Sequence, residues 1–139
     1  MQTTNRKEVL ELLQRQMNDL LRDAATDNAD LWSAMAQRAS MQSDAREMKE
    51  HLANIEHHML VNTEFNGRNA EIRAAQLQEA LRNDEAYVSL KTRLGNKELE
   101  IGRLDAQIEY LRNKVSLGKL AARWNIAVAE AFAADETVG

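Results

Sequence analysis

The chain has 139 residues, a formal net charge of −4, and neither proline nor cysteine. The absence of cysteine excludes disulfides, thiolate metal sites and cysteine nucleophiles, and the absence of proline leaves long helices uninterrupted. Aromatic residues make up 4% of the chain and charged residues 29%, a composition that favours long helices packed through narrow apolar stripes. No apolar segment has the length of a signal-peptide core or a membrane span, so we expect a cytoplasmic protein without membrane contact.

The first expected helix covers residues 5–25. Its apolar side chains recur at spacings of three and four, which places them on one helix face: Val9, Leu13, Met17, Leu20 and Ala24. The polar residues 26–30 favour a cap or a turn, because short polar side chains compete for backbone hydrogen bonds. The interruption could also be only a cap between two nearly collinear helices.

The second expected helix covers residues 30–60 and carries a heptad pattern. Its heptad seam alternates between spacings of three and four over four repeats, and every position but Arg38 is apolar: Leu31, Ala34, Arg38, Met41, Ala45, Met48, Leu52, Ile55 and Met59. Residues 62–69 are the clearest loop in the chain, since Asn66-Gly67 accepts positive φ and Asn69 can cap the next helix. A short helix over 70–82 follows.

The last expected helix covers residues 85–133. Its heptad positions hold β-branched residues at a and leucine at d, which favours two-stranded packing: Ile101, Leu104, Ile108, Leu111 and Val115. Gly118 occupies the next d position, so the heptad is expected to falter there. A different apolar stripe appears beyond it, with Leu117, Leu120, Ala121, Trp124, Val128 and Ala131.

The fold class predicted from these helices is all-α, in one helical domain over residues 1–139. The helices over 30–60 and 85–133 are expected to form an elongated antiparallel hairpin or coiled coil, with an additional N-terminal helix packed on it. Self-association through the last helix, as a homodimer, is the alternative way to bury its seam.

Catalytic motifs are absent from the sequence. No phosphate-binding loop, dinucleotide fingerprint or nucleophile elbow occurs, so we expect no enzymatic activity and no cofactor. Glu47, His51, Asn54 and His58 share one helix face and could hold a transition metal. Their spacing lacks a third strong ligand, and the interpretation kept is a polar helix face without metal.

Two sets of residues near the C-terminal end are candidates for binding. Leu117, Leu120, Trp124 and Val128 form an apolar helix face that could dock on a protein partner. The alternative is nucleic acid, because four basic residues with no intervening acid are bracketed by Tyr110 and Trp124: Arg112, Lys114, Lys119 and Arg123.

The second half of the chain resembles small, functionally uncharacterised coiled-coil proteins carried by bacteriophages. The matching positions are an Asn-Gly-x-Asn-Ala turn and an Asp-x-x-Tyr break before a long heptad helix: Asn66, Gly67, Asn69, Ala70, Asp84 and Tyr87. The resemblance implies a phage-encoded protein in the host cytoplasm. With the helical pattern, it leads us to expect a non-enzymatic protein that binds a host or phage protein. Inhibition of a host defence or nucleic-acid-handling complex is one form that this binding would take.

Overall fold

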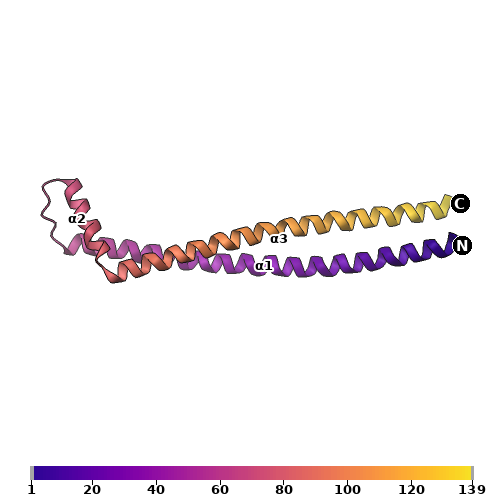
Figure 1. Cartoon of the computed structure of the whole chain (residues 1–139), viewed down its shortest axis with the longest axis horizontal. Helices are drawn as coiled ribbons and strands as arrows, with labels where there is room; N and C mark the ends of the chain where they lie inside the picture. Colours follow the sequence, from indigo (N-terminus) through magenta and orange to yellow (C-terminus); the bar gives the residue numbers. More distant parts are fainter. Residues whose placement is uncertain (1, 139) are drawn as a thin grey trace. The chain divides into compact units, whose positions relative to one another are not determined.

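The computed structural model describes residues 2–138, with the side chains of residues 5–135. It contains three helices, α1 (Gln2–Asn62), α2 (Ala70–Arg82) and α3 (Glu85–Val138), shown in Figure 1. No strand occurs between residues 2 and 138. The predicted all-α class is therefore confirmed.

Helix α1 continues through residues 26–30, where the sequence predicted a boundary between two helices over 5–25 and 30–60. That prediction is wrong, and there is no separate N-terminal helix. The apolar stripes on the two sides share one heptad, because Ala24 and Leu31 lie seven residues apart with Asp27 between them. The hydroxyl of Thr26 donates to the carbonyl oxygen of Arg22 at 3.2 Å, so this side chain bonds within the helix instead of ending it.

The chain divides into two compact units, each made of one segment of α1 and one of α3. The first unit comprises residues Met1–Met35 and Ala106–Gly139, and the second comprises Ala36–Asp105, which includes α2. The organisation into one domain over 1–139 stays a prediction.

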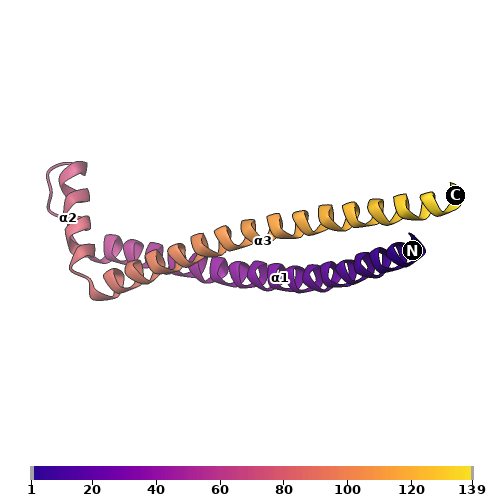
Figure 2. The same ribbon diagram turned by 45° about the vertical axis from the view of Figure 1, so that its right-hand side comes forward.

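The core of the second unit gathers where α2 meets α1 and α3. Leu52, Leu81 and Tyr87 are buried there, and Leu81 retains only 1% of its exposure. Figures 1 and 2 show α2 steeply inclined to the neighbouring segments of α1 and α3. Side chains cap the first turns of α2 and α3. Asn69 caps α2 by accepting from the amide of Ile72, and Asp84 caps α3 by accepting from the amide of Tyr87, each at 2.9 Å.

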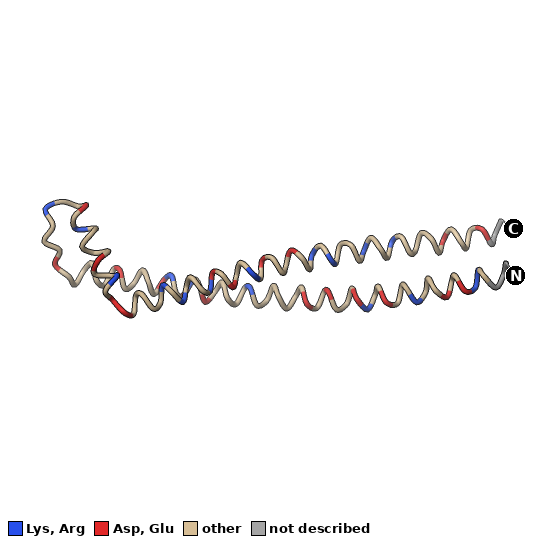
Figure 3. The backbone as a smooth tube through the Cα atoms, in the orientation of Figure 1, with Lys and Arg blue, Asp and Glu red and all other residues tan. Residues whose placement is uncertain are grey.

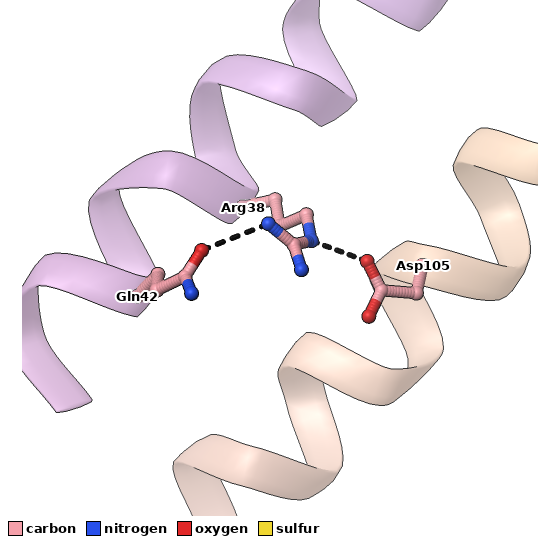
Figure 4. A network of polar contacts seen from close by, with 3 residues as sticks. All are labelled: Arg38, Gln42 and Asp105. Carbon is pink, nitrogen blue, oxygen red and sulfur yellow. Dashed lines mark hydrogen bonds and ion pairs between the residues drawn. The ribbon is translucent and has the colours of Figure 1, made fainter.

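Polar contacts join α1 to α3 elsewhere in the second unit. Arg38 pairs with Asp105 across the two helices and also donates to Gln42 at 2.8 Å, as Figure 4 shows. Lys49 and Glu98 form a second, more exposed pair at 3.6 Å. Residue numbers rise along α1 as they fall along α3, so the two segments run in opposite directions within this unit.

The first unit continues the heptad of α3 past Val115, where the sequence analysis expected it to falter. Asn125 is buried at 6% exposure, and the other positions of the repeat are half-buried: Gly118, Ala122, Ala129 and Phe132. The prediction was wrong because most of these residues are small, whereas the larger apolar residues next to them lie on another face of the helix. The seam of this unit therefore buries little apolar surface between α1 and α3.

Candidate binding surface on α3

A second heptad runs along α3 in the first unit, and we call it the outer stripe. Its members are all exposed and follow one another at alternating spacings of four and three: Ala106, Tyr110, Asn113, Leu117, Leu120, Trp124, Ala127 and Ala131. The four largest are exposed by 63% (Tyr110), 65% (Leu117), 57% (Leu120) and 73% (Trp124). Three of the four residues predicted to bind a partner thus belong to this stripe, and the fourth, Val128, lies beside it and is half-buried.

The position of the outer stripe follows from the seam. Residues seven apart stay on one side of a helix, so Leu111, Gly118 and Asn125 set the side that packs on α1. Leu117 and Trp124 each precede a seam position by one residue, and one residue turns a helix by about 100°. These side chains consequently point away from the packed side. Contiguous exposed apolar surface of this kind marks interaction sites in many proteins.

The four basic residues of the alternative site are not equivalent in the structure. The Nζ atom of Lys114 lies 3.0 Å from Oδ1 of Asp27, which is a buried seam residue of α1. The hydrogen bond to Asp27, and then its negative charge, raise the pKa of Lys114. Lys114 therefore serves the packing of α3 on α1 and is not a free contact for phosphate.

The other three basic residues remain available. Arg112 and Lys119 lie seven residues apart and Arg123 four further on, so they share one side of α3. Among the side chains of residues 5–135, none forms an ion pair with Arg112, Lys119 or Arg123. Figure 3 shows this stretch of α3 as blue positions without intervening red ones. The alternative site therefore keeps three basic residues that form no ion pair among the side chains of residues 5–135.

An apolar groove lies between α1 and α3 in the first unit. It has a volume of about 390 Å³ and is lined mainly by apolar residues: Leu10, Leu13, Met17, Ile126, Ala129 and Ala133. The residues that α3 contributes to the lining include two alanines, Ala129 and Ala133, whose small side chains leave space beside the leucines of α1. Sequence reasoning missed it, since the signal is a pairing of large with small residues across two helices.

Two of the three histidines line a hollow in the second unit. His51, Asn54 and His58 share it with Asp84, and its volume is about 540 Å³. Glu47 borders a different hollow, with His51 between the two. Within the described part of the chain, no three histidine, aspartate or glutamate side chains come together in a way that could hold a metal ion.

Comparisons with known proteins identify no relative of this chain. No protein-family model matches the chain, and searches of curated proteins and of solved structures gave no match. None of the helices between residues 2 and 138 is both long and apolar enough to cross a membrane. The resemblance to phage coiled-coil proteins therefore stays a prediction.

Proposed function

We propose that this protein acts by binding another protein through the outer stripe of α3, without catalysing a reaction. The observation that carries the proposal is the exposure of four large side chains over successive turns of one helix: Tyr110, Leu117, Leu120 and Trp124. At their observed exposures the two aromatic residues alone would bury roughly 200–340 Å², which corresponds to about 5–8 kcal/mol before the costs of association. Those costs are similar in size, so the leucines must contribute as well.

The wider arrangement and setting belong to the same proposal. We take the chain as an elongated antiparallel hairpin, and the opposite directions of α1 and α3 within each unit support this arrangement. The resemblance of residues 66–124 to phage proteins supports a phage-encoded protein in the cytoplasm of the host. Inhibition of a host defence complex is one concrete form that such binding would take.

Photo-crosslinking tests where binding occurs. A benzophenone amino acid placed at Leu117, and separately at Trp124, should give covalent adducts with a protein in living bacteria. The same group at Arg93 on α3, an exposed position outside the outer stripe, should give none. Adducts at all three positions, or at Arg93 alone, would contradict the proposed surface.

A Trp124→Ala variant separates binding from folding. Because Trp124 is exposed, the variant should keep its helical circular dichroism while losing the adduct formed at position 117. A loss of helicity would place Trp124 in the core and end the proposal.

Nucleic acid is the second candidate, supported by the three free cations on one side of α3. Binding through Arg112, Lys119 and Arg123 would neutralise few phosphates, so the logarithm of the binding constant should fall with the logarithm of salt concentration at a slope of roughly −2.7 for duplex DNA. Fluorescence anisotropy with short DNA and RNA at two salt concentrations measures this. Lys119→Glu with Arg123→Glu should abolish binding, and Arg15→Glu on α1 should reduce it little. Absence of binding at low salt would remove this function.

A further inference from the structure

We infer that the partner bound at the outer stripe is a second copy of this chain, with the two α3 helices antiparallel. The inference rests on the proposed function, because it names the partner of the same surface. A regular alternation of four and three from Ala106 to Ala131 extends over roughly 38 Å of helix. Such a face packs best on another helix with the same repeat, and α3 itself supplies one.

The sequence of the stripe is self-complementary in size when α3 is reversed. If Tyr110 lies opposite the partner's Leu120, then the partner's Ala106 lies opposite Trp124. Asn113 lies opposite the partner's Leu117, next to the twofold axis. Large residues thus meet smaller ones along the stripe, whereas a parallel pair would place each aromatic residue against its own copy. Mixed sizes in facing positions are what close packing requires.

The charges beside the stripe favour the same orientation. Glu109 and Arg123 lie on one edge of it, seven residues on either side of Ser116. In the antiparallel arrangement Glu109 faces the partner's Arg123, and symmetry makes this contact twice. Lys114 approaches its own copy near the twofold axis, but each lysine is already neutralised by Asp27 at 3.0 Å. Exposed pairs of this kind set orientation more than affinity.

The small apolar surface that α1 and α3 bury between them in the first unit explains why a second copy is needed. Gly118, Ala122, Asn125 and Ala129 offer little apolar surface to α1, while Leu117 and Trp124 lie outside. A standard interface buries about 800 Å² per partner. The two aromatic residues supply roughly 200–340 Å² of this, and Leu117 and Leu120, which are 65% and 57% exposed, add to it. A second copy is the one partner that is present wherever the protein is made.

Exchange of the two charges tests the inference by sedimentation velocity. The wild type should sediment with twice the mass of the 15.8 kDa chain. Glu109→Arg and Arg123→Glu should each raise the dimer dissociation constant roughly tenfold, since each places like charges opposite one another. The double variant should recover the wild-type constant. Arg93→Glu, which changes the net charge as Arg123→Glu does but lies on α3 outside the outer stripe, should have no effect.

The outcomes separate this inference from the proposed function. A dimer that responds to the charges as stated supports the antiparallel second copy. A dimer indifferent to Glu109 and Arg123 overturns the arrangement. A monomer at every concentration overturns the second copy, and the adducts at Leu117 then still decide whether a different protein binds there. Circular dichroism of each variant identifies any that fails to fold, and the double variant, which restores the pairing, keeps the test decisive.

Discussion

Lys114 on α3 reaches Asp27 on α1, and 3.0 Å separates its Nζ atom from the carboxylate oxygen. The Asp27 side chain is only 9% exposed, whereas that of Lys114 is 51% exposed. Asp27 occupies a position in the heptad of α1 that its neighbours fill with leucine and alanine. A shift of α3 by one heptad would leave this carboxylate buried without a cation, so the pair fixes the register of these two segments.

The contribution of the Lys114–Asp27 pair to the free energy of unfolding should disappear at high pH. Lys114→Gln should destabilise the protein at neutral pH, because Asp27 loses its cation. Since Asp27 raises the pKa of Lys114, the stabilisation is complete below the unfolded pKa of about 10.4 and is lost as the pH rises through the folded value. Urea unfolding should therefore show a difference between wild type and variant that shrinks above that pH. Lys119→Gln should show no difference throughout, and a difference independent of pH would contradict the account.

Removal of the Tyr87 hydroxyl should lower the free energy of unfolding of the protein. Its hydroxyl donates to Oε1 of Glu56 at 2.9 Å, and its ring is 8% exposed in the core of the second unit. The hydrogen bond to Glu56 and then burial raise the pKa of Tyr87, so the contact stabilises at neutral pH and is lost at high pH. Tyr87→Phe should cost about 0.5–1.5 kcal/mol of unfolding free energy. Tyr110→Phe, at an exposed position, should cost nothing measurable.

Two glycines should respond in opposite directions to alanine. A Cβ atom at Gly67 would lie 2.8 Å from Cγ2 of Ile72 and 2.9 Å from the amide nitrogen of Arg73. Gly67→Ala should therefore destabilise by about 1–3 kcal/mol. A Cβ atom at Gly95 meets nothing within 4 Å, and Gly95→Ala should stabilise the helix by up to about 1 kcal/mol. Thermal unfolding of both variants measures the contrast, which equal changes would refute.

Leu81 should anchor α2. It is 1% exposed and packs with Leu52 and Tyr87, so Leu81→Ala should cost about 2–5 kcal/mol. Leu99→Ala, at a position 64% exposed on α3, should cost little. Hydrogen exchange should show faster exchange of α2 amides in the Leu81 variant. Unchanged exchange there would mean that Leu81 does not hold the helix in place.

Features set by neighbours in sequence were predictable. The short helix over 70–82 has the bounds expected from the sequence, because Asn69 caps it locally. The positive φ expected at Asn66-Gly67 does not occur, since neither of these two residues has a positive φ. The continuity of α1 was not predicted, since Thr26 and Asp27 resemble a cap until their positions in the shared heptad are considered. The sequence could not show that Lys114 pairs with Asp27, because this contact depends on how α1 packs against α3.

The candidate surface was partly visible in the sequence. Leu117, Leu120 and Trp124 were grouped by their spacing, and the structure exposes all three. The reason for their exposure was missed, because the seam beside them consists mostly of small residues and carries a weak hydrophobic signal. Asn125 is the clearest example: it is polar by type, yet it occupies a buried seam position at 6% exposure.

The two tryptophans provide the most direct test of the central claim, that a second copy covers the outer stripe. In the single chain Trp32 and Trp124 are almost equally exposed, at 70% and 73%. Acrylamide quenching of Trp32→Phe reports on Trp124, and that of Trp124→Phe reports on Trp32. If a second copy covers the outer stripe, Trp124 should be quenched several-fold less than Trp32 and should become accessible in Glu109→Arg. Equal quenching of the two residues at every protein concentration would contradict the claim.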